Sequence, residues 1–306
     1  MSAASGQING LVRSAVGGKY EVELHRGEVV EAVLRGRLKQ QQRTGDAVVV
    51  GDRVQVRQHE DGNYTIEAVA ERQSELARAA PRAGRYRAKV LAANVDQIVA
   101  VFALVHPTPR LRMLDRFLVL AEANDLNAVV VANKADLADE EHFEPFRVYE
   151  RIGYPVVVTS ASTGQGIEDL RQHLCGRVSA LAGPSGVGKS SLLNAMDPDL
   201  QLRTAAVSEA VGKGRHTTVS ARLIPLSCGG YVADTPGLRE LGFWRIDPTE
   251  LDLHFPEFQD YLDSCRFGRS CSHDHEPGCA VRKAVEAGEI PVERFESYQA
   301  LLSPDD

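Results

Sequence analysis

One stretch, GPSGVGKS at residues 183–190, decides the fold class of this 306-residue chain. It follows a short apolar run, Ser179–Ala182, that reads as a buried strand, and a helical stretch, Ser191–Met196, comes directly after it. Its three glycines allow backbone N–H groups to converge on phosphate oxygens, in conformations that a side chain would block. A strand, a glycine-rich loop and a helix in this order predict a P-loop nucleotide-binding domain.

Each position of this loop has an expected part in binding phosphate. Gly183, Gly186 and Gly188 shape the loop. Lys189 balances the charge of the β- and γ-phosphates, which also makes it a catalytic candidate. Ser190 is expected to ligate Mg²⁺, and the amino terminus of the helix adds the positive end of its dipole. The other residues expected to contact the nucleotide here are Pro184, Ser185, Val187 and Ser191.

A second motif, NKAD at residues 133–136, indicates which base is bound. The Asp136 carboxylate can accept hydrogen bonds from guanine N1–H and from the 2-amino group, and adenine offers neither donor. Lys134 can lay its aliphatic stem along the base, and the Ala161 N–H can reach guanine O6. The expected base site is completed by Asn133 and Ser160. The motifs together predict GTP or GDP with Mg²⁺.

Two further elements fit the γ-phosphate side of such a site. DTPG at residues 234–237 ends an apolar run, so Asp234 can reach Mg²⁺ through water and the Gly237 N–H can meet the γ-phosphate. The polar run GKGRHTT at residues 212–218 can bring a threonine to Mg²⁺. Thr218 is favoured for this ligand, and Thr217 remains the alternative.

The order of these motifs is unusual. Ordinary P-loop GTPases have the phosphate loop first and the guanine motif late, whereas here Asp136 and Ala161 precede Gly183. This order indicates a circularly permuted domain, which can keep the same spatial site when the original termini lie close together. The permutation also leads the segment after Gly237 directly into the carboxyl-terminal region, so the nucleotide state could move that region.

Hydrophobic periodicity divides the chain into three expected domains. Residues 1–75 read as about five short strands and predict a β-barrel, an OB-fold. Residues 76–245 alternate apolar strands with amphipathic helices such as Arg110–Asn124, which predicts an α/β domain with a parallel sheet. Residues 246–306 are expected to form an α-helical module. The predicted buried strands are Val95–Leu104, Ala128–Ala132, Pro155–Thr159, Ser179–Ala182 and Tyr231–Ala233. Other predicted elements are an antiparallel edge strand, Val219–Leu226, and two short helices, Ala280–Ala287 and Val292–Leu302.

The start of the second domain, residues 76–94, reads as a basic linker. It carries five cations and no acidic residue up to Lys89, namely Arg78, Arg82, Arg85, Arg87 and Lys89. A solvated linker and a phosphate-contacting segment are equally open readings. The net charge of −7 argues against indiscriminate nucleic-acid binding, which depends on neutralising phosphates. The longest apolar run is too short to cross a bilayer and no secretory signal is visible, so a cytosolic location is expected.

Three of the five cysteines fall close together near the carboxyl terminus. Cys265, Cys271 and Cys279, with His273 between them, supply three thiolates and an imidazole, a complete tetrahedral set for one structural Zn²⁺. Such a closed set leaves no position for water, so the metal is expected to fold a tail that is short of apolar mass. Cys175 and Cys228 are expected to be ordinary small apolar residues.

A barrel, a permuted GTPase domain and a zinc module in this order resemble the ribosome small subunit-dependent GTPase A family. The most specific marks are NKAD before GPSGVGKSS, the GRHTT run and the cysteine cluster. The resemblance implies GTP hydrolysis in late maturation of the 30S subunit, stimulated by that subunit, with barrel and zinc module contacting rRNA. A monomer is expected. The family usually has four residues between the first two cysteines and this chain has five, so His275 is an alternative to Cys265.

The sequence leaves the residue that positions the attacking water the least determined part of the site. Many GTPases have a water-positioning glutamine just beyond DTPG, but Leu238 follows Gly237 here, which predicts slow hydrolysis by the chain alone. The resemblance gives His216 the catalytic role, with RNA contact or loop packing as the other reading. Two competing functions are an RNA-binding module with incidental hydrolysis and a metal-delivery GTPase with a labile metal.

Overall fold

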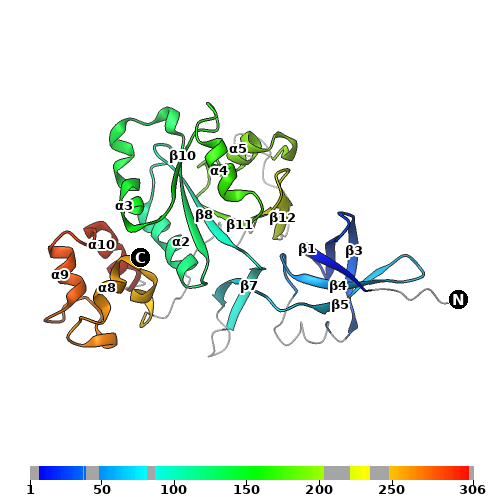
Figure 1. Cartoon of the computed structure of the whole chain (residues 1–306), viewed down its shortest axis with the longest axis horizontal. Coiled ribbons are helices and arrows are strands. Elements are labelled where there is room, and N and C mark those ends of the chain that lie inside the picture. Colours follow the sequence, from blue (N-terminus) through cyan, green and yellow to red (C-terminus); the bar gives the residue numbers. More distant parts are fainter. Residues whose placement is uncertain are drawn as a thin grey trace, which may run out of the picture.

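The chain has three structural parts along its length (Figure 1). The computed structural model describes residues 7–36, 38, 48–80, 87–202, 221–234 and 248–302. A β-barrel and a carboxyl-terminal helical module lie on opposite sides of a central α/β domain. None of the helices in these ranges is long and apolar enough to cross a membrane.

The first part is the predicted five-stranded barrel. Its strands are β1 (Ile8–Val16), β2 (Lys19–Leu24), β3 (Val29–Leu34), β4 (Arg53–Gln58) and β5 (Tyr64–Val69). Antiparallel pairs join β1 to β2, β2 to β3, β4 to β5 and β4 back to β1, and β3 pairs with β5 in parallel. This order closes the sheet. Alternate residues such as Val12, Val22, Val56 and Ile66 are fully buried inside, as the period of two along the strands requires.

The central domain contains the predicted parallel sheet. Its strands are β8 (Gln97–Ala103), β9 (Asn127–Asn133), β10 (Val156–Thr159), β11 (Val178–Ala182), β12 (Arg222–Pro225) and β13 (Tyr231–Asp234). They lie in the order β10-β9-β8-β11-β13-β12, and only the edge strand β12 is antiparallel to its neighbour in the domain. The helices are α2 (Leu111–Glu122), α3 (Glu144–Ile152), α4 (Ile167–Leu174) and α5 (Lys189–Met196), with short 3₁₀ turns at Ala135–Leu137, Glu140–His142 and Pro198–Leu200.

Strand β8 shows why this sheet needs helices on both faces. All seven of its residues are buried. Ile98 and Phe102 pack with residues of α2 and α3 on one side, whereas Val99 and Val101 pack with residues of α4 and α5 on the other. A continuous apolar strand is therefore the sequence mark of a parallel sheet covered on both sides.

The basic stretch predicted as a linker contains a β-hairpin. Strands β6 (Glu75–Ala80) and β7 (Arg87–Ala93) pair antiparallel. The base of the hairpin joins the barrel through an isolated parallel bridge between Val50 and Ala92. Gly51 lies so close to this strand that a Cβ there would stand 1.9 Å from the Ala93 carbonyl oxygen, so only glycine fits.

The barrel and the central sheet are continuous. Strand β1 pairs with β12 at Ser14 and Arg222, which joins the two parts into one sheet of eleven strands. At the same junction Asn94, with a φ of 52°, donates from Nδ2 to the Gly51 carbonyl and accepts from the Gln73 N–H. Backbone groups therefore take part in each of these contacts.

The carboxyl-terminal module is helical. Its elements are η4 (Leu251–His254), η5 (Pro256–Phe258), α8 (Gln259–Leu262), η6 (Gly268–Ser270), α9 (Ala280–Glu286) and α10 (Val292–Leu302). The two helices predicted here are present, and α10 has the predicted bounds. Phe255, Phe258 and Tyr298 form an aromatic core, which Val119 of α2 joins. The module thus packs against helix α2 of the central domain.

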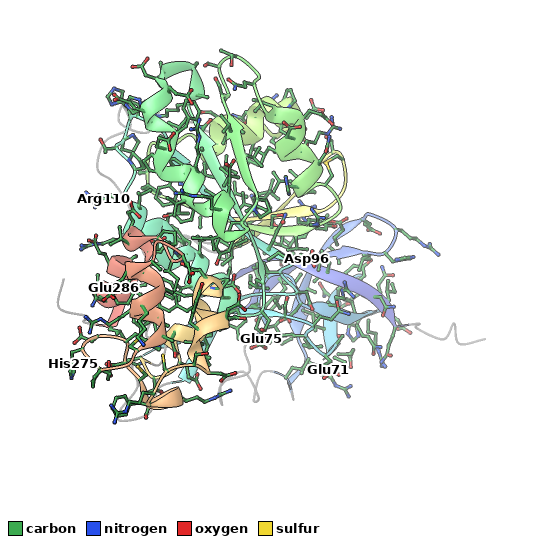
Figure 2. The ribbon with its side chains drawn as sticks, turned by 60° about the vertical axis from the view of Figure 1, so that its left-hand side comes forward. Glu71, Glu75, Asp96, Arg110, His275 and Glu286 are labelled. Atoms are coloured by element: carbon green, nitrogen blue, oxygen red, sulfur yellow. A yellow bond between two sulfur atoms is a disulfide. The ribbon has the colours of Figure 1, made fainter. Side chains whose placement is uncertain are left out.

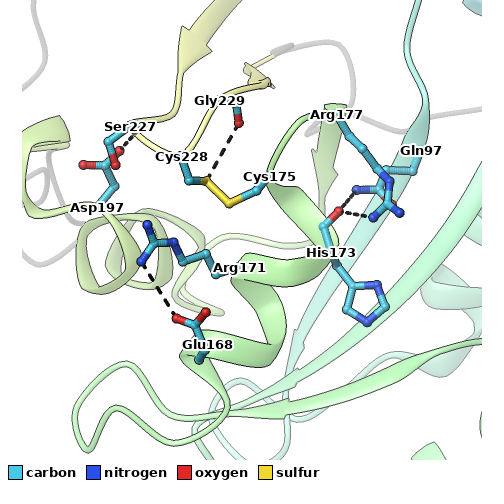
Figure 3. Close-up of a disulfide and its surroundings, with 10 residues drawn as sticks. All are labelled: Gln97, Glu168, Arg171, His173, Cys175, Arg177, Asp197, Ser227, Cys228 and Gly229. Carbon is cyan, nitrogen blue, oxygen red and sulfur yellow. Dashed lines mark hydrogen bonds and ion pairs between the residues drawn. A yellow bond between two sulfur atoms is a disulfide. The ribbon is translucent and has the colours of Figure 1, made fainter.

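One expectation about the cysteines is wrong. Cys175 and Cys228 are joined by a disulfide (Figure 3). Cys175 follows α4, and Cys228 lies in the turn between β12 and β13. The two residues are 53 positions apart in sequence. Neither local spacing nor composition indicated that these two segments meet.

Candidate nucleotide and metal sites

The phosphate loop runs from β11 into α5, as the sequence predicts. Gly183, Gly186 and Gly188 have φ values of 135°, 80° and 99°, a region that favours glycine. A Cβ at Gly183 would lie 2.1 Å from the Val101 carbonyl oxygen, and one at Gly188 would lie 2.4 Å from Asn133 Nδ2. The packing of the loop against β8 and β9 therefore requires glycine at residues 183 and 188, whereas Gly186 is favoured by its φ.

The charged groups of the phosphate side lie around one small cavity. Lys189 Nζ donates to the carbonyls of Gly183 and Pro184 at 2.6 and 2.7 Å, which holds the ammonium across the loop. Asp234 lies at the carboxyl end of β13, the strand beside β11. The cavity has a volume of about 260 Å³ and is lined by Leu181, Lys189, Ser190, Leu193, Leu202, Ile224, Val232 and Asp234. The arrangement gathers an ammonium, a hydroxyl and a carboxylate, the groups that bind a phosphate together with its Mg²⁺.

The NKAD motif is tied directly to the phosphate loop. Asn133 is buried, donates from Nδ2 to the Val187 carbonyl at 2.7 Å and accepts from Thr159 Oγ1 at 3.1 Å. Lys134 has a φ of 65° and donates from Nζ to the carbonyls of Gly186, at 2.7 Å, and of His106. The side chains of the base motif therefore fix its distance from the phosphate loop.

Asp136 is oriented by a serine pair. Ser160 Oγ, which is buried, donates to Asp136 Oδ1 at 2.6 Å and lies 3.0 Å from Ser162 Oγ. Hydrogen bonds from Ser160 and then Ser162 lower the pKa of the Asp136 carboxyl, so it stays an ionised acceptor. Ala161 lies between these serines and is half-buried. The sequence assigned Ser160 to the base site without showing this contact, and it gave no sign of Ser162.

Several predicted site residues lie outside the described residues. They are His216, Thr217, Thr218, Gly237 and Leu238. Their proposed parts in catalysis and Mg²⁺ binding therefore rest on the sequence.

The four predicted zinc ligands meet in the carboxyl-terminal module. Cys265, Cys271, His273 and Cys279 are buried, and their ligand atoms all lie within 4.8 Å of one another. His273 Nδ1 is 3.6 Å from Cys265 Sγ and 3.4 Å from Cys279 Sγ, and the last two sulfurs are 3.9 Å apart. These separations suit the edges of a tetrahedron with metal–ligand distances of about 2.0–2.3 Å.

The alternative ligand, His275, does not join this cluster. Its side chain is 84% exposed, and Figure 2 shows it at the outer edge of the module. Cys265 is the fourth group instead. Burial raises the pKa of the Cys271 thiol to about 12, and a bound dication would reverse this shift by binding the thiolate. The donor set therefore fits one structural Zn²⁺.

A carboxylate that the sequence did not indicate supports this cluster. Asp252 Oδ2 lies 3.2 Å from His273 Nε2, the ring nitrogen that faces away from the sulfurs. A carboxylate in this position fixes the tautomer that presents Nδ1 to a metal. Asp252 belongs to η4, an element that also packs against α2 of the central domain.

The fold and the site together define a class. A phosphate loop after β11, and a guanine motif on strand β9 earlier in the chain, make the central domain a circularly permuted P-loop GTPase. Comparison with family models matches the RsgA N-terminal domain over residues 9–66 and the RsgA GTPase over residues 69–244. The chain belongs to the RsgA GTPase family.

Individual relatives agree over almost the whole chain. The small ribosomal subunit biogenesis GTPase RsgA of Gemmatimonas aurantiaca is 51% identical, with 95% of each chain covered, and that of Moorella thermoacetica is 45% identical, with 97% covered. The crystal structure of YjeQ from Thermotoga maritima matches with a TM-score of 0.80 at 40% identity, covering 97% of this chain and 98% of that one. YloQ, a circularly permuted GTPase, matches with a TM-score of 0.75 at 32% identity, covering 99% and 96%. The resemblance seen in the sequence is confirmed.

Proposed function

We propose that this GTPase acts in late maturation of the small ribosomal subunit, where it hydrolyses GTP to GDP and phosphate with stimulation by the subunit. The observation that carries the proposal is the permuted site itself, with Asp136 fixed by Ser160 and tied through Lys134 to the phosphate loop. The relatives that match nearly the whole chain carry the name small ribosomal subunit biogenesis GTPase. A cytoplasmic monomer is the form that suits this role.

The proposed chemistry assigns a task to each polar group. Asp136 and the Ala161 N–H read guanine, and Lys189 neutralises charge on the β- and γ-phosphates. Ser190 and Thr218 would hold Mg²⁺, with Asp234 acting through water. When bound, Mg²⁺ supplies positive charge to the phosphate oxygens. Pre-placed charges of this kind lower the barrier because they need no reorganisation during the reaction.

His216 is the proposed residue that positions the attacking water, and Gly237 the proposed N–H donor to the γ-phosphate. Leu238 offers no polar atom for this work, so hydrolysis by the free protein is slow. The subunit is then the activator. Replacing His216 by Ala should abolish the stimulated turnover while leaving GTP affinity within about three-fold. Unchanged stimulated turnover in this variant would remove His216 from the mechanism.

The base site has a sharper test. In Asp136→Asn, the carboxylate that accepts from the 2-amino group of guanine is replaced by an amide that can donate to the 2-oxo group of xanthine. The variant should therefore lose affinity for GTP by about 10³-fold or more and gain affinity for xanthosine triphosphate. Ser160→Ala is the matched control, since it removes only the group that orients Asp136. It should weaken GTP binding by about ten-fold without gaining the xanthine nucleotide. Retained GTP preference in Asp136→Asn would contradict the assignment.

Two surfaces support an RNA partner. The β6–β7 hairpin is rich in basic residues: Arg78 pairs with Lys89 in its backbone register, and Ala80 pairs with Arg87. In the module, Arg266 and Arg269 flank Phe267, whose side chain is 45% exposed. Cations that contact phosphates and an exposed ring that can stack on a base are the usual parts of an RNA surface. The barrel, the hairpin and the zinc module are therefore the proposed rRNA contacts.

The GTPase rate with and without purified 30S subunits tests the proposal. A stimulation of about ten-fold or more is expected, because a partner must supply what Leu238 cannot. The same rate in both conditions would contradict the partner. Retention on 30S particles is then compared with GTP and with a non-hydrolysable analogue. A GTPase that must hydrolyse GTP to leave the subunit stays bound longer with the analogue, whereas an RNA-binding module with incidental hydrolysis does not.

The same preparation tests the role of the metal. A structural zinc in a closed Cys₃His set should resist mild chelation, because each ligand is buried. Zinc that leaves readily and passes to an acceptor protein would favour metal delivery instead.

A further inference from the structure

The disulfide lies at the amino ends of two neighbouring strands, whereas the proposed nucleotide site lies at the carboxyl ends of the same strands. Cys175 lies just before β11, separated from it by Gly176 and Arg177, and Cys228 lies in the β12–β13 turn, separated from β13 by two glycines. Strands β11 and β13 are parallel, and both carry their nucleotide-binding residues at the carboxyl ends. The five residues of β11 place about 16 Å between the cysteines and the phosphate loop. The link therefore cannot touch the reacting groups.

The turn that carries Cys228 is held in place by other contacts as well (Figure 3). The Gly176 N–H donates to the Gly229 carbonyl at 2.9 Å, and the Tyr231 N–H donates to the Arg177 carbonyl at 2.8 Å. On the other side, the Ser227 N–H donates to Asp197 Oδ2 at 2.7 Å. These contacts tie the two cysteine-bearing segments together independently of the S–S bond, across which the Cα atoms are 5.5 Å apart. Because the folded chain already holds the two segments together, forming the S–S bond costs little further conformational entropy.

Close packing confirms that the turn has little room to move away. Gly230 has a φ of 84°, and a Cβ there would lie 2.5 Å from the Arg177 carbonyl oxygen. Cys175 and Cys228 are both half-buried, so a small thiol or disulfide can reach the sulfurs. The other three cysteines in the described part of the chain are buried in the metal cluster. This pair is accordingly the accessible site for thiol–disulfide exchange.

We propose that Cys175 and Cys228 are a reversible redox modification site, at which a low-molecular-weight disulfide such as oxidised glutathione forms a staple across the phosphate-binding half of the GTPase domain. One protein thiolate attacks the small disulfide, which releases one thiol and leaves a mixed disulfide. The second protein thiolate then attacks the protein sulfur of that bond and releases the other thiol. The two protein thiols lose two electrons and two protons, and the small disulfide gains them. Excess small thiol reverses both steps.

The staple acts on stability because of what it encloses. The closed segment, residues 176–227, contains β11, the phosphate loop, α5 and β12. The guanine motif, residues 133–136, lies outside it. Closing a loop of this length restricts the unfolded chain more than the folded one. The oxidised protein should therefore hold its phosphate-binding half folded without nucleotide, whereas the reduced protein depends more on bound nucleotide.

The test uses the full zinc-loaded chain, equilibrated with either reduced or oxidised glutathione. Alkylation followed by peptide mass mapping should show a Cys175–Cys228 link only in the oxidised sample. The midpoint of thermal unfolding without nucleotide should rise by about 5–10 °C on oxidation. Turnover of GTP should change by less than about two-fold, because the link lies at the far end of β11.

Cys175→Ala with Cys228→Ala is the matched control, since it leaves the zinc cysteines intact. It should unfold within about 2 °C of the reduced protein under both conditions. Each single variant should also lose the shift on oxidation, which guards against a folding defect in the double variant. Alkylation of both cysteines as free thiols after oxidation, or a link that leaves the unfolding midpoint unchanged, would overturn the proposal.

Discussion

The barrel and the carboxyl-terminal module both attach to the GTPase domain, but by different means. The barrel is joined mainly through backbone: the Ser14–Arg222 pair, the Val50–Ala92 bridge and the carbonyl of Gly51. The module is joined through side chains. Arg294 of α10 is 1% exposed and donates to Asp115 of α2 at 2.5 Å and to Glu257 of η5 at 2.6 Å.

The ion cluster of Arg294 is fully supported by its neighbours. The guanidinium carbon lies 4.6 Å from the ring centre of Phe255 and 5.8 Å from that of Tyr149. Tyr149 also donates its hydroxyl to Asp115 at 2.8 Å, and its burial raises the pKa of this phenol. The comparison teaches that a backbone junction tolerates many side chains, whereas a buried ion cluster depends on every member.

This difference bears on how the nucleotide state could move the carboxyl-terminal module. The permuted order suggested that nucleotide state could move the module directly through the segment after Gly237. In the structure the module also packs on α2, at Val119 and Asp115. Any such movement must therefore separate the Arg294 cluster or carry α2 with it.

The largest expected effect comes from the metal that holds the module together. Cys279→Ser should lose most of the zinc and unfold the module, because structural zinc contributes on the order of 10 kcal/mol to folding such sites. The measurements are zinc content and limited proteolysis between residues 248 and 302. GTP binding by the central domain should persist. His275→Ala, an exposed neighbour, is the control, and equal zinc content in both variants would contradict the ligand set.

The next largest effect is at the module junction itself. Arg294→Met leaves two buried carboxylates without a cation and should cost about 3–5 kcal/mol of unfolding free energy. Denaturant unfolding followed by far-UV circular dichroism measures this loss. Glu293→Gln, one residue earlier on the same helix and exposed, should change stability by less than about 0.5 kcal/mol. A loss below about 1 kcal/mol for Arg294→Met would show that apolar packing alone holds the junction.

At the barrel side, one contact is a buried ion pair. Asp52 is fully buried and accepts from Arg72 at 2.8 and 3.0 Å and from the Val49 N–H at 2.8 Å. The hydrogen bonds to Asp52 raise the pKa of Arg72. Asp52→Asn should cost about 2–3 kcal/mol, because it removes the charge but keeps a polar acceptor.

Glu75 provides the matched control for Asp52, since it also pairs with Arg72 but is 46% exposed on its side chain. Glu75→Gln should cost less than about 0.5 kcal/mol in the same unfolding measurement. Equal losses in the two variants would mean that burial does not set the strength of this contact.

The smallest effect is expected at the exposed edge of the barrel junction. Arg222 and Glu21 lie 3.5 Å apart with 60% and 48% of their side chains exposed. Arg222→Ala should cost about 0.5 kcal/mol or less, and the cost should vanish in high salt. A salt-insensitive loss above about 1 kcal/mol would show that the side chain has a larger part in the junction than the backbone pair at Ser14.

The sequence by itself determined the three parts of the chain, the permuted order and the guanine and phosphate motifs. It also predicted the metal cluster except for one ligand, because the choice between Cys265 and His275 was left open until the structure placed Cys265 with the other three. These follow from local patterns: a strand period of two, a glycine-rich loop between a strand and a helix, and metal-ligating residues close together in sequence. Each pattern is physically complete within a short segment, so it can be seen without the fold.

Only the tertiary structure decided which distant segments meet. Arg294 with Asp115, Asp252 with His273, Ser162 with Asp136, and Cys175 with Cys228 are pairs separated by 179, 21, 26 and 53 positions. A single arginine, aspartate, serine or cysteine carries no sign of its partner, because its interaction energy depends on burial and distance that the whole fold creates. The physical reason is that the conformation of a motif depends on residues that are neighbours in sequence, whereas contacts between distant segments form only when the chain has packed.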